Sequence, residues 1–481
     1  MLFSSTIFIF LFLPVVSFLY FIVREKFRNA VLLLASLLFY AYGEPKFIFV
    51  LLASMAVNYL FALGLDKLSA VQRPKMRKSV FIAGVAVNVF ILFICKYLNF
   101  TITIIDDLFG DILKTLPITL PIGISFYTFQ AISYLADVYR KEVEAQKNPI
   151  NLALYISFFP QLIAGPIVRY KTMAEALESR QENWADITYG VRRFLTGLGK
   201  KVILSNNLSI IAEYAFGFEN YENLPVVTAW IGAVSFSLQI YYDFSGYSDM
   251  AIGLGRIFGF HFEENFRYPY AAENITDFWR RWHISLSAWF RDYIYIPLGG
   301  SRVRVGRHIF NLFVVWCVTG IWHGAAWNFL AWGLCYFVLL VLEKYVLHPD
   351  RIKSGVLKAV YRIGTLIGVN FLWVLFNAKA EYGMSALRRG AGYCMSMIGC
   401  NHNPLFETRI LFYLQEYGWF FAVALLVSVP VLPKLKKLCA KNKAGEMLWE
   451  TAAGVGLAVA FLFSVANLVI GSHNPFIYFN F

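Results

Sequence analysis

Charged residues are scarce in this chain. Only 15% of its 481 residues are Asp, Glu, Lys or Arg, whereas soluble domains carry about 25%. Hydrophobic residues make up 58%, and the mean hydropathy is +0.57. Several apolar runs reach the roughly 18 to 20 residues that a helix needs to cross a hydrocarbon core. Because they lack strict alternation, the sequence predicts an all-α polytopic membrane protein rather than a barrel.

Motifs of metal binding, disulfide frameworks and nucleotide binding are also missing. None of the six cysteines belongs to a CxxC pair, so we expect small buried hydrophobic side chains at Cys95, Cys317, Cys335, Cys394, Cys400 and Cys439. There is no GxSxG elbow, Walker loop or HExxH motif. The run GLGRIFG at 253–259 is not a nucleotide fingerprint, because no strand precedes it and its glycine spacing is wrong.

The basic residues that are present indicate orientation. The net charge is +13, but the positive residues gather in short loops at Arg24–Arg28, Arg73–Lys78 and Arg140–Lys147. This is the positive-inside pattern, so it predicts cytoplasmic loops and no nucleic-acid partner. An acidic patch of Asp106, Asp107 and Asp111 falls on the other side. The N-terminus is therefore expected outside.

The expected order of spans is set by these loops. The first five lie near 3–23, 29–42, 47–65, 80–98 and 116–137. The run from Leu2 to Val23 has no basic n-region or cleavage site, so we expect a retained span. The basic run Lys434–Lys443 precedes a last span near 447–470, which places the C-terminus, NPFIYFNF, outside as well.

The middle third is less regular. Residues 150–170 contain Pro160, Gly165 and Pro166, which break helix geometry and predict a re-entrant segment. The run 263–307 is too polar to cross lipid directly. Within it, Asn274 and Asp277 resemble a capping pair that starts a helix through about Arg291, and Pro297 with Gly299–Gly300 stops any helix beyond that point. No repeat or linker is evident, so one membrane domain is expected.

His323 is the first candidate for chemistry. It lies in the apolar stretch VTGIWHGAAWNFLAWG, residues 318–333. An ionisable side chain inside a span is costly, so it predicts a functional group that faces a cavity. The small residues around it allow helices or a ligand to approach closely. The alternative is an interfacial aromatic belt, in which a histidine between tryptophans is unremarkable.

Other polar residues in apolar surroundings are weaker candidates. His283, in FWRRWHISLSAWFRD, alone fits an interfacial helix that binds headgroups, but its proximity to a second membrane histidine favours function. We expect four buried polar residues to line a tunnel or to pair with Arg256 and Arg267; they are Asp243, Ser245, Ser248 and Asp249. Gln130, Tyr134 and Asp137 share one helix face and predict an interhelical contact. The remaining histidines, 261, 308, 348, 402 and 473, are expected near loops without a special role.

With both histidine segments in view, the chain resembles a bacterial membrane-bound O-acyltransferase of the alginate O-acetyltransferase type. The resemblance covers most of the chain and weakens after about residue 340. It is carried by five stretches: LPIGISFYTFQAISYLADVYR (120–140), FFPQLIAGPIVRY (158–170), QIYYDFSGYSDMAIGLGRIFGF (239–260), NFRYPYAAENITDFWRRWHISLSAWFRDYIYIPLGG (265–300) and GIWHGAAWNFLAWG (320–333).

The resemblance implies that His323 matches the catalytic histidine and His283 the second functional histidine. It also implies a ring of about eleven helices with re-entrant segments around a central tunnel, in the inner membrane of a bacterium. A cytoplasmic funnel would admit the acyl thioester, and an outer funnel the acceptor. A secreted or anchored acyltransferase of the SGNH type often finishes the transfer in this family.

Acyl transfer from a thioester needs a base and a group that holds charge on the carbonyl oxygen. We expect His323 as the general base. His283 is expected to orient the acceptor or polarise the carbonyl, with help from a neighbouring tryptophan N–H. We also expect acetyl-CoA as donor substrate, no bound cofactor, and Arg280, Arg281 and Arg291 near the donor's phosphates. The candidate substrate-binding side chains are Arg280, Arg281, Trp282, Arg291, Asp292, Trp322, Trp327, Asn328, Asp243 and Ser245.

Three functions stay open at this point. The first is O-acetylation of an extracytoplasmic polysaccharide. The second is transfer of D-alanine from a carrier-protein thioester to teichoic acid on the same fold. The third is a non-enzymatic lipid or polysaccharide transporter, in which paired membrane histidines form a proton relay.

Overall fold

The fold is built from helices. The computed structural model describes residues 1–110, 112–471 and 473–477, and 75% of the chain is helical. None of these described residues belongs to a β-strand, so the all-α prediction is confirmed. Asp111 of the acidic patch and the last four residues of NPFIYFNF lie outside the described residues.

Seven helices among the described residues are long and apolar enough to cross a membrane. They span Ile48–Ala70, Pro74–Phe109, Val305–His323, Trp327–Arg351, Gly355–Asn377, Arg409–Val427 and Lys443–Val469. A multi-pass membrane protein is therefore confirmed, while about eleven helices in a ring with re-entrant segments stays a prediction.

The chain forms two compact units, which are described separately. The first contains Met1–Phe194 and Tyr247–Glu264, and the second contains Leu195–Gly246 and Asn265–Phe481. Helix α12 (Val226–Ile257) contributes residues to both. The expectation of a single membrane domain over 1–481, with N-terminal spans at 1–140, a catalytic core at 150–335 and C-terminal spans at 336–481, stays a prediction.

In the first unit, helix α6 (Ile124–Arg140) is almost completely buried. Helices α3, α4, α7 and α9 pack against it. Of its predicted polar face, the Tyr134 hydroxyl accepts a hydrogen bond from the Gln146 amide at 2.8 Å. The unit's helices are α1 (Leu13–Ile22), α2 (Glu25–Gly43), α3 (Ile48–Ala70), α4 (Pro74–Leu92), α5 (Leu98–Phe109), α6, α7 (Pro149–Ser157), α8 (Phe159–Leu162), α9 (Tyr170–Glu178) and most of α10 (Trp184–Gly199).

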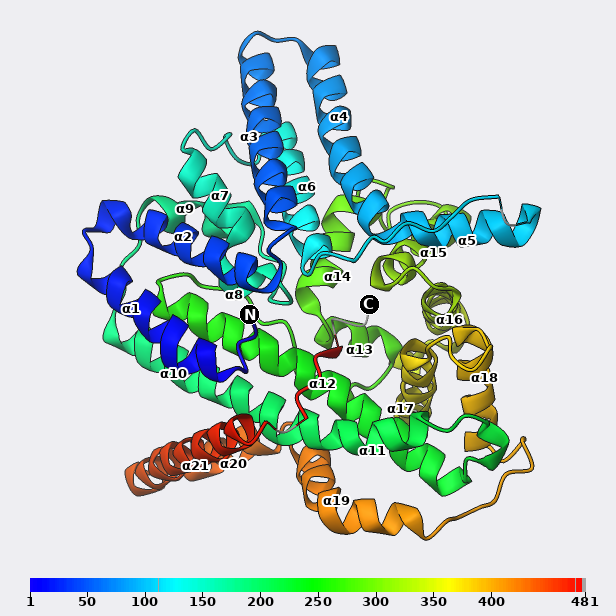
Figure 1. The fold of residues 1–481 in the computed structure, drawn as a ribbon. Coiled ribbons are helices and arrows are strands. Elements are labelled where there is room, and N and C mark those ends of the chain that lie inside the picture. The colour runs from blue at the N-terminus through cyan, green and yellow to red at the C-terminus, as the bar shows by residue number, and fades with distance from the viewer. Residues whose placement is uncertain (111, 472, 478–481) are drawn as a thin grey trace. The chain divides into compact units, whose positions relative to one another are not determined.

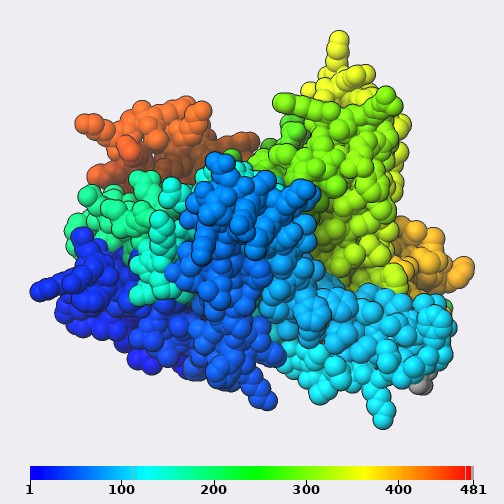
Figure 2. Space-filling view, turned by 90° about the horizontal axis from the view of Figure 1, so that it is seen from above, coloured from blue at the N-terminus to red at the C-terminus, as the bar shows by residue number. Residues whose placement is uncertain are grey.

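The five expected spans have different limits in the structure. The span expected at 3–23 is a shorter apolar helix, Phe8–Ile22, which is not among the seven. Two others differ markedly. The span expected at 80–98 is longer, because a π-helical turn at Phe93–Tyr97 joins α4 to α5. Figure 2 shows the α5 region, in light blue and cyan, as a lobe of this unit, and Leu108 and Phe109 are exposed on it. The span expected at 116–137 becomes helical only after Gly123. Gly123 has φ +77°, and a Cβ there would lie 2.5 Å from the Leu162 carbonyl oxygen.

The segment 150–170 forms two short, buried helices, α7 and α8. Pro160 lies at the start of α8, and the chain then turns and extends to Arg169. The predicted break in helix geometry is therefore present, and re-entry into the membrane stays a prediction.

The second unit holds most of the remaining helices (Figure 1). They are α11 (Asn206–Phe216), α13 (Ile275–Arg281), α14 (Ile284–Phe290), α15 (Val305–His323), α16 (Trp327–Leu342), α17 (Gly355–Asn377), α18 (Ala386–Met397), α19 (Arg409–Val427), α20 (Val431–Cys439) and α21 (Lys443–Val469). Aromatic residues of α12, α13, α15, α16 and α17 form its core. Only 6% of the apolar window of α21 is buried in the protein, so nearly all of its surface is available to lipid.

A pair of buried asparagines links α3 to α4 in the first unit. The Asn58 amide donates to the Asn88 side-chain oxygen at 3.0 Å, and the Asn88 amide donates back to Asn58 at 2.8 Å. Both side chains are buried in apolar helices. Each amide therefore depends on the other for hydrogen bonds that water does not supply.

We expect Asn88→Ala to destabilise the first unit. Loss of the Asn88 amide leaves the Asn58 side-chain oxygen without its donor, at a cost of about 1–2 kcal/mol, while the Asn58 amide still donates to the Ser54 carbonyl oxygen. Thermal unfolding in detergent, followed by size-exclusion of a fluorescent fusion, measures this. Asn467→Ala is the matched control, because the Asn467 amide bonds a carbonyl of its own helix. Equal unfolding midpoints for both variants would contradict the prediction.

Candidate functional site

The stretch around His323 is a tight turn between two helices of the second unit. Helix α15 ends at His323, residues 324–326 are not helical, and α16 starts at Trp327. The helices pack closely where Gly320 and Gly333 meet their neighbours. A Cβ on Gly320 would lie 2.6 Å from the Phe329 carbonyl oxygen, and one on Gly333 would lie 2.5 Å from that of Trp316. The small residues near His323 therefore allow the hairpin to close.

Aromatic rings surround the half-buried imidazole of His323. The ring centroids of Trp322, Trp332 and Phe376 lie 4.9, 5.0 and 5.1 Å from its own. The imidazole also lines a small, mostly apolar space of about 30 Å³, which we call the His323 cavity. Its other lining residues are Ile240, Asp243, Phe244, Trp282, Trp373, Phe376, Phe476 and Ile477. The expected cavity at His323 is therefore present in this unit.

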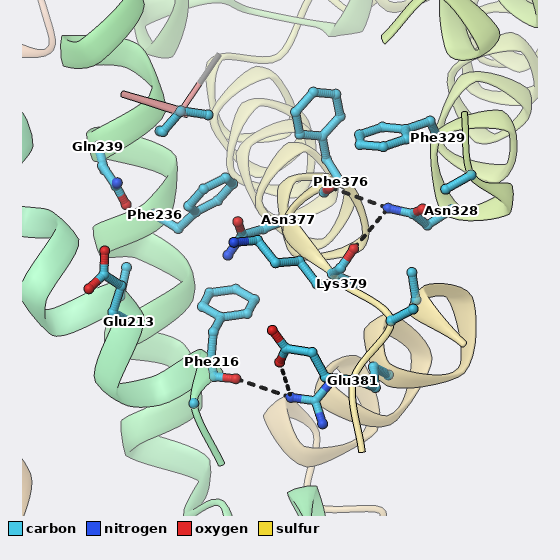
Figure 3. Close-up of a pocket in the computed structure, with 18 of the residues that line it drawn as sticks. Glu213, Phe216, Phe236, Gln239, Asn328, Phe329, Phe376, Asn377, Lys379 and Glu381 are labelled. Carbon is cyan, nitrogen blue, oxygen red and sulfur yellow. Dashed lines mark hydrogen bonds and ion pairs between the residues drawn. The ribbon is translucent and has the colours of Figure 1, made fainter. Parts of the chain in front are cut away.

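A larger hollow, the vestibule, shares Phe376 and Ile477 with the His323 cavity. It measures about 1240 Å³ including its mouth. Figure 3 shows Glu213 and Gln239 on one wall and Asn377 and Lys379 on the opposite one. Phenylalanines 216, 236, 329 and 376 line the vestibule as well. Polar and aromatic side chains together suit a ligand that carries many hydroxyl groups.

A third hollow, the arginine pocket, lies between α13, α14 and α15. Arg280 and Arg291 line it together with Trp279, Trp316 and other mainly apolar residues. Trp279 and Trp316 both contact Trp332, with centroids 5.6 and 6.2 Å apart, and Trp332 contacts His323. One indole ring thus links the wall of this pocket to the imidazole.

His283 interrupts the helix that was expected to run through Arg291. That prediction is wrong in its length: α13 ends at Arg281, and α14 starts at Ile284. His283 itself has φ +44°, a left-handed conformation that non-glycine residues rarely adopt. The break is held by Asn265, whose carbonyl oxygen accepts from the Ile284 amide at 2.9 Å. The expected start is confirmed, since the Asn274 side chain accepts from the Asp277 amide at 2.7 Å.

The His283 ring is held by the same asparagine. The Asn265 side-chain oxygen lies 3.1 Å from His283 Nδ1 and also accepts from the Ser285 hydroxyl at 2.9 Å. A carbonyl oxygen is an acceptor, so Nδ1 carries the proton. Burial lowers the pKa of His283, which lies outside the seven spans, well below its usual range, so the ring is neutral at physiological pH. Trp322 contacts both His283, at 6.3 Å, and His323.

Glu343 fixes the start of α13, and its role was not anticipated from the sequence. Its buried carboxylate accepts from the Ile275 amide at 2.7 Å and from the Thr276 amide and hydroxyl at 2.9 and 2.8 Å. A carboxylate at a helix N-terminus satisfies amides that lack partners within the helix. In the sequence, only the position of this glutamate directly after an apolar helix could have indicated its role.

Asp243 pairs with a cation that was not expected from the sequence. Its carboxylate lies 2.7 Å from Lys201 Nζ, and Asp249 pairs with Arg193 in the first unit at 2.6 Å. The expected pairing of these carboxylates with Arg256 and Arg267 is therefore wrong for both. Lys201 is nearer because α12 packs against the π-helical turn Lys200–Ser205, where a Cβ on Gly246 would lie 3.2 Å from that of Lys200.

The remaining predicted site residues are dispersed. Ser245 is buried, and among the described residues its hydroxyl has no hydrogen-bond partner. Asn328 lines the vestibule and donates to the Ala378 carbonyl at 3.1 Å. Trp327 is 50% exposed and lines none of the three hollows. Three of the charged candidates form two ion pairs: Arg281 with Asp277 at 2.9 Å, and Arg291 with Asp292 at 2.7 Å.

Residues 140–385 match the model of the MBOAT, membrane-bound O-acyltransferase family. The chain belongs to this family. It is 40% identical to the probable alginate O-acetylase AlgI of Pseudomonas aeruginosa, over 79% of this chain and 72% of that protein. It is 34% identical to the peptidoglycan O-acetyltransferase of Helicobacter pylori, over 100% and 98% of the two chains. It is 30% identical to the teichoic acid D-alanyltransferase of Bacillus subtilis, over 47% and 59%.

Membership confirms the resemblance inferred from the five stretches. The matched region contains both histidine segments and the α15–α16 hairpin. This membrane-bound O-acyltransferase is therefore an enzyme that transfers acyl groups, which decides against a non-enzymatic transporter.

We expect Gly333→Ala to destabilise the hairpin that holds His323. The added methyl group would collide with the backbone of α15, and overpacking of this kind costs about 1–3 kcal/mol. Thermal unfolding of the purified protein measures it. Gly368→Ala on α17 is the control, because a Cβ there meets nothing within 4 Å. A Gly333→Ala midpoint at or above that of Gly368→Ala would contradict the expected clash.

Proposed function

We propose that the protein passes the acetyl group of cytoplasmic acetyl-CoA across the membrane for O-acetylation of an extracytoplasmic polysaccharide. Relatives named as alginate and peptidoglycan O-acetylating proteins support the acetyl group and the class of acceptor. The observation that carries the proposal is the His323 imidazole in a cavity that shares walls with the vestibule.

In this reaction His323 acts as the general base. Its ring takes the proton of the acceptor hydroxyl while the hydroxyl oxygen attacks the thioester carbonyl. A C–O bond forms, the C–S bond breaks, and the coenzyme A thiolate leaves and is protonated. A neighbouring tryptophan N–H assists by donating to the carbonyl oxygen; Trp332 supports this role, because its ring contacts His323 and its buried indole N–H has no hydrogen-bond partner among the described residues.

His283 acts on this centre indirectly, through Trp322. It does not line the His323 cavity, but its neutral ring contacts Trp322, which in turn contacts His323. We assign it the role of holding Trp322 in place for the acceptor rather than direct contact with the carbonyl.

The donor enters through the arginine pocket, where Arg280 and Arg291 meet the phosphates of acetyl-CoA. Arg302, Arg304 and Arg307 lie at the N-terminal end of α15, and Lys344 and Lys353 come after the C-terminal end of α16. The positive-inside rule assigns that end of the hairpin to the cytoplasm and the His323 end to the outside. The vestibule then receives the acceptor on the outer face.

The wider setting belongs to the same proposal. The chain acts as one multi-pass domain of a bacterial inner membrane, with both termini outside and lipids around α5 and α21. A secreted or anchored acyltransferase of the SGNH type takes the acetyl group onward to the glycan. No bound cofactor is required, because acetyl-CoA is a substrate.

The decisive experiment supplies radiolabelled acetyl-CoA to proteoliposomes and measures label on an oligosaccharide acceptor. We expect His323→Ala to fold and to lower kcat by about 10³-fold, because a general base contributes about 10²–10⁴. Full activity of this variant would refute the assignment. Transfer only from a charged carrier protein would support D-alanylation instead. The similarity to the teichoic acid D-alanyltransferase, which covers 47% of the chain, favours this alternative.

We expect Arg280→Ala/Arg291→Ala to raise the KM for acetyl-CoA by about tenfold with little change in kcat, because the arginines bind a part of the donor that does not react. Steady-state kinetics in the same vesicles measures both constants. Lys358→Ala serves as the control, since this exposed lysine lines none of the three hollows. An unchanged KM for acetyl-CoA in the double variant would contradict donor binding in this pocket.

A further inference from the structure

The Lys201–Asp243 ion pair has no role in the proposed acyl transfer. Lys201 is 1% exposed and Asp243 is 2% exposed, and their charged atoms lie 2.7 Å apart. Burying two charges is expensive unless further hydrogen bonds satisfy them. The groups that satisfy this pair therefore indicate what it holds.

Most of those groups come from one short stretch of chain, residues 473–477, which we call the tail segment. Lys201 Nζ donates to the Pro475 carbonyl oxygen, and the Ile477 amide donates to Asp243 at 2.9 Å. Asn206 reinforces both ends: its oxygen accepts from Lys201 at 2.9 Å, and its amide donates to the Asn474 side chain at 3.2 Å. The tail segment is thus tied to each member of the ion pair by its backbone.

This attachment places the tail segment at the reaction centre. Phe476 and Ile477 line the His323 cavity, and Pro475 and Ile477 line the vestibule. Phe376, which contacts His323, also borders both spaces. Within the second unit, Ile477 of the tail segment and Phe376 therefore form part of the wall between the vestibule and the His323 cavity.

We propose that Lys201 and Asp243 are positioning residues that hold the tail segment as part of this wall. The inference rests on the proposed function for its link to the reaction, but the attachment itself does not. With the ion pair in place, the wall limits access to the imidazole. Without it, the tail segment leaves, the two spaces join, and water reaches the thioester.

The test uses full-length protein in nanodiscs. Lys201→Met alone leaves a buried carboxylate unpaired, which by itself can prevent folding. The double variant Lys201→Met/Asp243→Asn buries no charge and decides the outcome in that case. Asn206→Ala is a second neutral variant that removes the ties to Lys201 and Asn474. Lys436→Met is the matched control, since Lys436 pairs with Glu450 at 3.2 Å at an exposed site.

The first readout is hydrogen–deuterium exchange of the C-terminal peptide that contains the tail segment. We expect exchange to accelerate by about 100-fold in Lys201→Met/Asp243→Asn, less in Asn206→Ala and not at all in Lys436→Met. Slow exchange in the folded double variant would overturn the proposal. This readout does not need activity, so it holds even if acetyl-CoA is not the donor.

The second readout is the ratio of acetyl-CoA hydrolysis to acetyl transfer. We expect kcat for transfer to fall by about tenfold in the double variant while hydrolysis rises, a split that general destabilisation would not produce. An unchanged ratio with a mobile tail segment would overturn the link to the reaction. Absence of transfer in the wild-type protein would instead count against the proposed function, with the exchange result still standing.

Discussion

The structure depends on one constraint: polar groups inside a membrane protein must find their partners within the protein, because lipid offers none. Several buried polar residues of this chain obey it. Asn58 and Asn88 bond each other, His283 bonds Asn265, and the Lys201–Asp243 ion pair is completed by backbone groups of the tail segment. His323 lies among aromatic rings at the edge of a cavity. Under the proposed function, this imidazole is retained there because protein and substrate together replace water.

Helix breaks, rather than helices, place the reactive groups. His323 occupies the last residue of α15, and His283 occupies the non-helical residue before α14. Close packing at Gly320 and Gly333 supports the first break, while Asn265 and the carboxylate of Glu343 support the segment around the second. Because these supports are backbone contacts and buried hydrogen bonds, small changes in them would move the rings. Such irregular backbone is tolerated at this depth only where protein shields it.

The sequence predicts the class well, because the class depends on local composition. Apolar runs identify membrane helices, and the WHGAAW segment with its small residues singles out His323 as a candidate whose role stays a prediction. The helix break at His283 was not predicted, because Asn265 lies 18 residues away in the chain. No residue near His283 in the sequence indicates the hydrogen bonds that Asn265 makes. Lys201 and the tail segment were missed for the same reason: residues 201, 243 and 477 meet only in the folded protein. The helix in the span expected at 116–137 starts later than expected, because the chain has a positive φ at Gly123, directly before α6.

In the proposed reaction the acetyl group crosses the membrane at His323, from the arginine pocket to the vestibule. The sharpest measurement of this route uses vesicles in which all molecules have one orientation, with labelled acetyl-CoA on one face and an oligosaccharide acceptor on the other. We expect labelled product only when the donor is on the face that carries the basic loops. Equal labelling with the donor and acceptor on the same face, or with the two exchanged, would contradict a crossing at His323.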